Sequence, residues 1–288
     1  MKLYSLETIR YLKDKYGFKL SKSLGQNFMI DMNKLRAIVD ASGTGEEDLV
    51  IEIGPGIGAL TAVAADAASH VTAIEIDEGL RPILSETLAD KGNVDVVFAD
   101  VLDVDLKKLI EDKKREFDVA GRVRIMGNLP YYITTPIVMK LLESDLGVDS
   151  ITIMTQKEVA ERMGAGPGGK EYGALSLMVQ YRCRVDQVTR VPRECFYPVP
   201  KVDSAIVNFT MLGEKSVAVD DEKVFFDCIR AGFGQRRKTL LNALSAGLGK
   251  PRDQIRTCLE RAGIDPSRRA ETLTQEEFAG LANEITRG

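Results

Sequence analysis

The sequence holds few residues that could bind a metal ion. It has one histidine, His70, and four cysteines, no two of which form a C-x-x-C pair. The cysteines are Cys183, Cys195, Cys228 and Cys258. Metal sites need closely spaced cysteine, histidine or acidic ligands. We therefore predict reduced, mostly structural cysteines and no metal site.

Long hydrophobic runs are also absent. No apolar stretch approaches the roughly 20 residues that span a bilayer, and the first eight residues include an acid, Glu7, instead of the apolar core of a signal peptide. The 288 residues, of which 44% are hydrophobic and 28% charged, suit a soluble protein with one large and one small domain, or two of middling size. We expect a cytoplasmic protein without membrane contact.

Acidic and basic residues are unevenly distributed, although the net charge is only −4. Residues 42–118 contain 18 acidic and 7 basic side chains, whereas the rest of the chain contains 25 acidic and 32 basic ones. Phosphate contacts need local rather than global positive charge. The basic part is compatible with an RNA- or DNA-binding face, and also with charges scattered over a solvated surface.

Short β-rich runs alternate with segments of helical length in the first part of the chain. The runs are Leu49–Ile53, Val71–Ile76, Val94–Ala99, Val123–Met126 and Ile151–Met154. Such alternation predicts an α/β fold with a parallel sheet and crossover helices. One crossover helix should begin at Pro136, after a cap at Thr134 or Thr135. Ser204–Phe209 alternates apolar and polar residues, which indicates a late antiparallel strand against the edge of the parallel sheet.

The pattern changes near residue 212. Beyond it, residues 225–233, 239–248, 253–262 and 275–285 have helical periodicity. We therefore predict a catalytic domain over residues 1–212 and a small all-α domain over residues 213–288. The glycine-rich segment 164–169 can gate a site or simply connect two helices.

A glycine-rich turn, Gly54-Pro-Gly-Ile-Gly58, follows the first predicted strand. Glycines let the backbone turn tightly beneath a ligand, so Gly54 and Gly56 are candidate cofactor contacts. Their spacing differs from the dinucleotide fingerprint G-x-G-x-x-G. Glu75 ends the next strand, where a carboxylate can accept hydrogen bonds from both ribose hydroxyls of an adenosine. NAD enzymes and S-adenosylmethionine (SAM) enzymes share that device, so Glu75 does not decide between them.

A further acid, Asp100, ends the third strand. It can accept a hydrogen bond from an adenine amino group while Val101 packs on the ring. With Glu52 and Glu75 it places three acids beside the cofactor, which would repel the pyrophosphate of NAD and attract the sulfonium of SAM. The sequence therefore favours SAM as the methyl donor and a Rossmann-like methyltransferase sheet.

Asn128-Leu-Pro-Tyr131 follows the fourth strand, at the sheet edge where ligands bind in open α/β folds. The Asn128 side-chain oxygen and the Leu129 carbonyl can accept hydrogen bonds from an exocyclic amine and align it with the methyl group. Pro130 stiffens the loop, and Tyr131 offers a face for a stacked purine. These four residues predict methyl transfer to a base nitrogen, which requires the base to leave its helix.

A second aromatic and proline-rich loop precedes the last predicted strand. It reads Cys195-Phe-Tyr-Pro-Val-Pro-Lys-Val-Asp-Ser204. Phe196 can cover the other face of the flipped base, or it can serve only to anchor the loop.

Seven motifs in order resemble the rRNA adenine-N6,N6-dimethyltransferases, and most of all the bacterial small-subunit group linked to kasugamycin sensitivity. The resemblance covers residues 21 to about 242 and is specific as an ordered set. The motifs are Ser23-Leu-Gly-Gln-Asn-Phe28, Glu52-Ile-Gly-Pro-Gly56, Ile74-Glu75, Ala99-Asp100, Gly127-Asn-Leu-Pro-Tyr131, Phe196-Tyr-Pro-Val-Pro200 and Phe233-Gly-Gln-Arg-Arg-Lys-Thr-Leu240.

The resemblance implies dimethylation of two adjacent adenosines in the 3′-terminal hairpin of 16S rRNA, within an immature small ribosomal subunit, by a monomeric enzyme. It also implies SAM contacts, which would lie at Asn27, Met29, Gly54, Glu75, Asp100 and Asn128. At Met29 the family often has leucine. Basic residues beside the motifs are expected to contact RNA phosphates. They are Lys19, Lys22, Arg236, Arg237 and Lys238.

Four other functions remain open. A large-subunit rRNA methyltransferase of the macrolide-resistance type shares the cofactor loop, although Leu129 and the segment 233–238 favour the small-subunit kind. A DNA adenine methyltransferase would need a base-reading insertion, which is not evident. An NAD oxidoreductase lacks a credible proton-transfer residue, because His70 precedes the second strand. An RNA-binding assembly factor with secondary or lost catalysis is the alternative of a different class.

Overall fold

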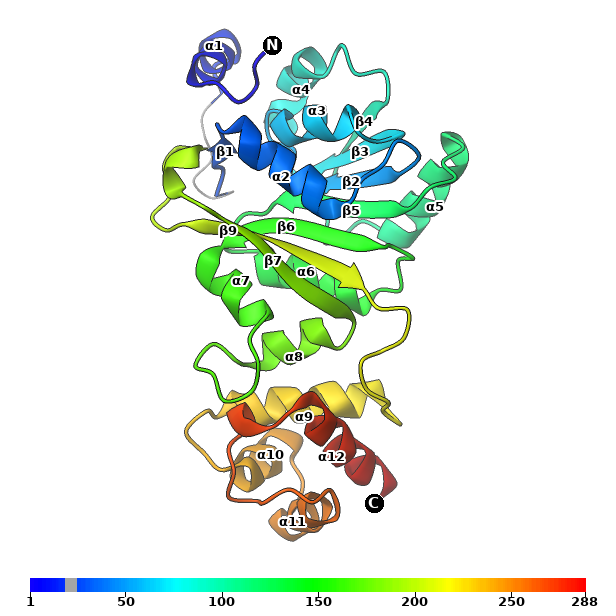
Figure 1. Ribbon diagram of the computed structural model, residues 1–288, viewed down its shortest axis with the longest axis vertical. Helices are drawn as coiled ribbons and strands as arrows, with labels where there is room; N and C mark the ends of the chain where they lie inside the picture. The colour runs from blue at the N-terminus through cyan, green and yellow to red at the C-terminus, as the bar shows by residue number, and fades with distance from the viewer. Residues whose placement is uncertain (19–24) are drawn as a thin grey trace. The chain divides into compact units, whose positions relative to one another are not determined.

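The computed structural model of the chain describes residues 1–18 and 25–288 (Figure 1). Its contacts divide the chain into two compact units. Unit 1 comprises Met1–Ala160 and Asp186–Met211, and unit 2 comprises Glu161–Val185 and Leu212–Gly288. Residues 161–185, which the sequence-based division kept with residues 1–212, thus belong with the C-terminal helices.

Seven strands form one mixed sheet, in the order β4-β3-β2-β5-β6-β9-β7. They are β2 (Leu49–Ile53), β3 (His70–Glu75), β4 (Val94–Phe98), β5 (Val123–Asn128), β6 (Ser150–Gln156), β7 (Cys183–Val191) and β9 (Ser204–Met211). The five strands from β2 to β6 are parallel, as predicted. The late strand β9 is antiparallel to β6, also as predicted. It adds to β6, the last strand of the parallel part, and β7 lies on its other side.

Helices cover the sheet on both faces: α2 (Met32–Ser42) and α3 (Ala59–Ala65) lie on one, and α6 (Thr134–Glu143) on the other (Figure 1). The remaining helices of this part are α1 (Leu6–Tyr16), α4 (Arg81–Thr87), α5 (Leu106–Glu116) and α7 (Lys157–Met163). Helix α2 begins where Asp31 accepts hydrogen bonds from the backbone N–H groups of residues 33 and 34, and it ends at Gly43 in the left-handed conformation. The α/β fold class is confirmed.

A two-stranded antiparallel sheet joins distant parts of the chain. Strand β1 (Phe28–Met29) pairs with β8 (Phe196–Tyr197), so that Met29 lies opposite Phe196. The backbone of Ile30 extends the contact by donating to the Cys195 carbonyl at 2.8 Å. The segment that carries Asn27 is therefore fixed against the loop that precedes β9.

The single histidine begins β3, away from the carboxyl ends of the strands. Its Nε2 lies 2.6 Å from Asp95 Oδ1, and its ring stacks on Phe117 with 3.5 Å between the ring centroids. Lys113 also contacts Asp95, at 3.0 Å. His70 thus has a structural environment, which removes it as a proton-transfer residue at the carboxyl edge.

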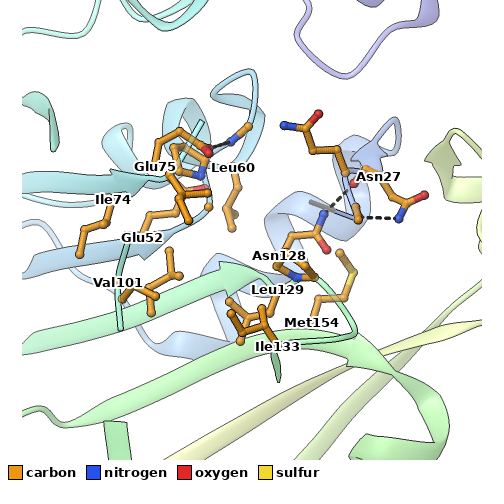
Figure 2. A pocket seen from close by; sticks show the side chains of 18 of the residues that line it. Asn27, Glu52, Leu60, Ile74, Glu75, Val101, Asn128, Leu129, Ile133 and Met154 are labelled. Carbon is orange, nitrogen blue, oxygen red and sulfur yellow. Dashed lines mark hydrogen bonds between the residues drawn. The ribbon is translucent and has the colours of Figure 1, made fainter. Parts of the chain in front are cut away.

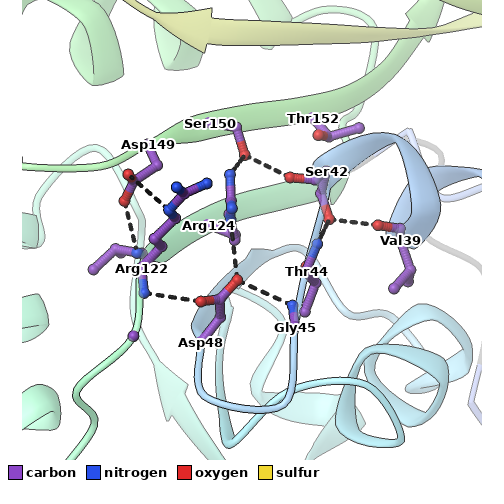
Figure 3. Close-up of polar contacts among 12 residues, drawn as sticks. Val39, Ser42, Thr44, Gly45, Asp48, Arg122, Arg124, Asp149, Ser150 and Thr152 are labelled. Atoms are coloured by element: carbon purple, nitrogen blue, oxygen red, sulfur yellow. Dashed lines mark hydrogen bonds and ion pairs between the residues drawn. The ribbon is translucent and has the colours of Figure 1, made fainter. Parts of the chain in front are cut away.

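A buried ion pair lies at the amino ends of the strands (Figure 3). The guanidinium of Arg124 donates to Asp48 Oδ2 at 3.2 Å and to Ser150 Oγ at 3.1 Å. Burial alone would raise the pKa of Asp48, but hydrogen bonds from the backbone of Gly45 and Arg122 and from Arg124 outweigh it and hold that pKa below its usual value. These hydrogen bonds join the start of β2 to β5 and β6.

Unit 2 is helical. Its helices are α8 (Ala174–Gln180), α9 (Glu222–Gly234), α10 (Leu240–Leu248), α11 (Arg252–Arg261) and α12 (Gln275–Arg287). The last four match the predicted helices within a few residues. Tyr172, Leu177 and Tyr181 are buried in one core with Phe225 and Phe278, which explains why residues 161–185 belong to this unit. In neither unit does the described part of the chain contain a helix long and apolar enough to cross a membrane.

Candidate active site

A cavity opens at the carboxyl ends of β2, β3, β4 and β5 (Figure 2). The space between its walls is about 1160 Å³, including solvent at the mouth. Its lining includes every predicted cofactor residue and all of residues 128–131, which we call the clamp for the target base, but not Phe196. The predicted residues in the lining are Asn27, Met29, Gly54, Gly56, Glu75, Asp100, Val101, Asn128, Leu129, Pro130 and Tyr131. The parallel register causes the convergence, since strand ends in one sheet meet at one edge.

The turn after β2 passes under the cavity in a conformation that favours glycine. Gly54 has φ +73° and Gly56 has φ +59°. A Cβ on Gly56 would also lie 2.9 Å from the Phe28 ring, so the turn and β1 are in close contact. The glycines therefore let the backbone of β2 approach a ligand closely.

Glu75 joins this turn to the end of β3. Its Oε2 accepts from the Gly56 N–H at 3.1 Å and its Oε1 from the Asp77 N–H at 2.9 Å, although the residue is only 5% exposed. Burial raises the pKa of Glu75, and the backbone hydrogen bonds oppose that shift. A carboxylate has about four acceptor positions, so Glu75 keeps acceptor capacity beyond these bonds, as a ribose contact would need.

Glu52 lies beside Glu75 on the cavity wall (Figure 2) and is only 1% exposed. Within the described residues, neither its Oε2 nor the nearby Thr61 Oγ1 has a hydrogen bond of good geometry. Burial raises the pKa of Glu52 to about 8, and the charge of Glu75 adds to that effect, whereas Thr61 opposes it. At neutral pH Glu52 is therefore mostly protonated.

Asp100 and Val101 form the wall beyond β4. Asp100 is half-buried, and its Oδ1 accepts from the Leu102 N–H at 2.9 Å. Val101 is buried and lines the cavity next to it. A flat apolar surface and an acidic acceptor thus lie side by side, as an adenine ring would require.

Asn128 ends β5, across the cavity from Glu52 and Glu75 (Figure 2). Its Nδ2 donates to the Asn27 carbonyl at 3.0 Å, and the Asn27 side chain in turn donates to the Gly25 carbonyl at 2.9 Å. Because the Nδ2 is held in this way, the orientation of the amide is fixed and Oδ1 is available as an acceptor. Asn27 thereby contributes to the clamp, a role that its position near the N-terminus does not suggest.

Hydrogen bonds also hold the other residues of the clamp in place. Leu129 is buried and donates its N–H to the Met154 carbonyl at 3.2 Å, and the Tyr131 hydroxyl lies 2.7 Å from Ser204 Oγ. Burial raises the pKa of Tyr131. A Cβ on Gly127 would lie 2.5 Å from the Ile53 carbonyl oxygen, so β5 can lie this close to β2 only with glycine there.

Phe196 is not brought to the cavity. It is 1% exposed and packs in the core with Val191 and Ile206, because its pairing with Met29 turns its ring inward. An aromatic residue that the sequence analysis did not single out, Tyr132, lines the cavity instead and is 60% exposed. Its place directly after the clamp was the only signal for it.

The structure describes three of the five basic residues that were predicted to contact RNA. Arg236, Arg237 and Lys238 are exposed in the turn between α9 and α10 of unit 2. Arg236 donates to the backbone carbonyl of Lys170, 2.8 Å away. Lys19 and Lys22 lie outside the described residues.

None of the four cysteines forms a disulfide bond, and Cys195 alone among them is not buried. Among residues 1–18 and 25–288 no three histidine, cysteine or acidic side chains are grouped as a metal ion would require.

Comparison with known proteins agrees with these observations. Residues 17–287 match the family described as ribosomal RNA adenine dimethylase. The Ribosomal RNA small subunit methyltransferase A of Alkaliphilus metalliredigens is 51% identical over 286 residues, which cover 99% of this chain and 98% of that protein. The protein of the same name from Clostridioides difficile is 49% identical, over 99% of this chain and 97% of its own length.

Two solved structures share the fold. The dimethyladenosine transferase from Plasmodium falciparum has a TM-score of 0.74 at 24% identity, covering 90% of this chain and 98% of its own. The 23S rRNA methyltransferase ErmE has a TM-score of 0.67 at 27% identity, covering 90% and 99%. On the full-length family match and the half-identical relatives, the chain belongs to the ribosomal RNA adenine dimethylase family, whose members are methyltransferases.

Proposed function

We propose that the protein transfers methyl groups from SAM to N6 of two adjacent adenosines in the 3′-terminal hairpin of 16S rRNA, in an immature small ribosomal subunit. The observation that carries the proposal is the single cavity that Glu75, Asp100 and Asn128 all line. Relatives at about 50% identity that are named for the small subunit support this substrate over the large-subunit one.

The residues of the cavity suit this cofactor. When bound, SAM supplies a methyl group on a positively charged sulfur. The acids Glu52, Glu75 and Asp100 line the cavity, and among its described lining residues there is no lysine, arginine or histidine. Such a lining favours a cation and disfavours a pyrophosphate. Glu75 would hold the ribose hydroxyls, Asp100 and Val101 the adenine, and the glycine turn would lie under the amino-acid part.

Asn128 and Leu129 would position the target amine. The Asn128 Oδ1 and the Leu129 carbonyl would accept hydrogen bonds from the N6 amino group and so direct its lone pair at the methyl carbon. Tyr131, with its hydroxyl held by Ser204, would stack on the base. Positioning of this kind can supply much of the rate without a tuned general base. Met29 and Asn27 would complete the cofactor contacts through the backbone beside the clamp.

We further propose that the two units have different roles. Unit 1 would carry catalysis, and unit 2 would contribute to rRNA binding through Arg236, Arg237 and Lys238. Within unit 2, Lys170 lies next to Arg236, and the Gly168 N–H donates to the Glu271 carbonyl at 2.8 Å. The glycine-rich segment 164–169 would thus be part of the RNA-binding surface rather than a gate. The protein would act as a cytoplasmic monomer.

The test is methyl transfer from labelled SAM to undermethylated small subunits, with large-subunit rRNA and DNA as parallel substrates. Dimethyladenosine in the small-subunit rRNA alone is expected. Product in large-subunit rRNA alone would reassign the substrate, and tight subunit binding without transfer would indicate an assembly factor.

A further inference from the structure

Glu52 is a buried acid that the contacts of the protein do not account for. It lies on β2 and lines the cavity, and in the described part of the chain its Oε2 has no hydrogen bond of good geometry, although Thr61 lies close enough to lower its pKa. Buried polar atoms in folded proteins are almost always hydrogen-bonded, so an orphan on a cavity wall calls for a ligand. A neutral carboxyl tolerates the orphan better than a carboxylate, which fits the protonated state of Glu52 in the protein alone.

The polar groups that line the cavity or lie beside Glu52 leave it free to respond to a ligand. Glu75 on β3 has both oxygens engaged by backbone N–H groups. Asp100 after β4 accepts from Leu102, and Asn128 on β5 donates to Asn27. Thr61 on α3 is the remaining neighbour. None of these groups is a cation, so any positive charge that ionises Glu52 must arrive with the ligand.

We infer that Glu52 distinguishes the methyl donor from its spent product, by giving up its proton when the positively charged donor enters and regaining it when the sulfur becomes neutral. The inference rests on the proposed function, because it takes SAM as the donor. On binding, the O–H bond of Glu52 breaks, the electron pair stays on the carboxylate and the proton passes to solvent. After transfer the sulfur is an uncharged thioether, and the carboxylate takes a proton back from solvent. Glu52 thereby lowers the affinity for the product relative to the donor.

The pH dependence follows from this linkage. A cation nearby lowers the pKa of Glu52 from its value of about 8 in the protein alone. Binding of the donor therefore releases protons at pH values between the pKa in the complex and about 8. Over that range the affinity for SAM rises with pH, and above it the affinity levels off. The product, S-adenosylhomocysteine, keeps only its amino and carboxyl charges, so its affinity should rise less.

Titration calorimetry at pH 7, in three buffers that differ in ionisation enthalpy, measures the protons released on binding. For the wild-type protein we expect roughly one proton per SAM bound and clearly fewer for S-adenosylhomocysteine. Glu52→Gln removes the proton and keeps the shape. In that variant proton release should vanish, and SAM affinity should fall by about tenfold relative to S-adenosylhomocysteine, the equivalent of one pKa unit.

Glu75→Gln is the matched control, since it replaces the neighbouring acid. It should weaken both ligands by a similar factor and reduce proton release only as far as the loss of its charge lowers the pKa of Glu52, so that SAM still releases more protons than S-adenosylhomocysteine. Equal proton release for the two ligands in the wild type, or unchanged discrimination in Glu52→Gln, would overturn the inference while leaving the proposed function intact. Absence of SAM binding to the wild type would overturn both. The wild-type comparison decides the matter even if the variant does not fold.

Discussion

The side-chain amide of Asn128 donates a hydrogen bond to the main-chain oxygen of Asn27, 101 residues away in sequence and 3.0 Å away in space. One bond thus joins the N-terminal motif to the loop that would hold the target amine. It fixes which end of the Asn128 amide faces the cavity. Asn27 therefore acts on the clamp through its backbone, and its side chain braces the turn at Gly25.

Asn128→Ala is expected to abolish transfer while largely sparing SAM binding. It removes both the acceptor for the amine and the donor to Asn27, so we expect the single-turnover rate to fall by at least about 100-fold, the scale seen when one positioned hydrogen-bonding group is removed. The SAM dissociation constant should change by less than about threefold. Single-turnover transfer and calorimetry on one preparation test both parts, and retained turnover would refute the clamp.

Glu75→Ala is expected mainly to weaken SAM binding. It removes a buried carboxylate that would accept from the ribose and that already accepts from Gly56 and Asp77. Hydrogen bonds to a charged group are worth about 1.5–3 kcal/mol, so the dissociation constant should rise by roughly 10- to 100-fold. An unchanged constant, measured by calorimetry, would place the ribose contact elsewhere.

Gly127→Ala is expected to destabilise the fold and to slow transfer. The added Cβ would lie 2.5 Å from the Ile53 carbonyl oxygen, so β5 must move away from β2. Overpacking of this kind costs about 1–3 kcal/mol, to be measured by urea unfolding. Gly280→Ala, on the exposed face of α12 with nothing within 4 Å, is the matched control and should be neutral or slightly stabilising. Equal effects of the two changes would contradict this account of Gly127.

Arg124→Ala is expected to cost about 3–5 kcal/mol of unfolding free energy, because it leaves Asp48 buried without its partner. The pKa of Asp48 is lower in the folded state than in the unfolded one. Its contribution to stability is therefore present above the unfolded pKa and is lost as the pH falls through the folded one, below about pH 4. Urea unfolding from pH 7 to pH 3 measures this loss, and in Asp48→Asn that acid-dependent part should be missing.

Replacing Arg236, Arg237 and Lys238 together by alanine is expected to weaken binding to the small subunit and to make it less sensitive to salt. Each lost phosphate contact should reduce the slope of log affinity against log salt by roughly 0.7–0.9. Lys223→Ala is the control. Lys223 lies on α9, the helix that precedes this turn, but its Nζ pairs with Asp227 Oδ2 at 2.7 Å. A slope that the triple change leaves untouched would remove these residues from the RNA-binding surface.

The sequence was sufficient for the five parallel strands, because they are short apolar runs whose ends carry glycine, acid or amide groups. The parallel order then places Gly54, Glu75 and Asn128 at one edge without further information. Boundaries that depend on tertiary contacts were harder. The predicted start of α6 at Pro136 was wrong, because the helix begins at Thr134. The Thr134 hydroxyl donates a hydrogen bond to the Pro130 carbonyl and does not cap the helix.

Other features had no local signal. Strand β7 escaped notice because Cys183–Val191 is rich in charged and polar residues. The inward turn of Phe196 depends on a two-residue pairing with the distant β1, which periodicity cannot reveal. Residues 161–185 belong to unit 2 because Tyr172 and Tyr181 are buried in its core. Aromatic residues can pack in the core of either unit, so their presence alone did not assign this segment. Asn27 was found by resemblance alone.

The pairing of β1 with β8 also bears on how the chain is made. Met29 leaves the ribosome early, whereas its strand partner Phe196 is translated some 167 residues later. Until then the five parallel strands can assemble, but the segment that orients Asn128 has no partner to hold it. A nascent or truncated chain that stops short of β8 should therefore carry the glycine turn and the acids without a functioning clamp. Competence for methyl transfer would then arise only near the end of synthesis of this domain.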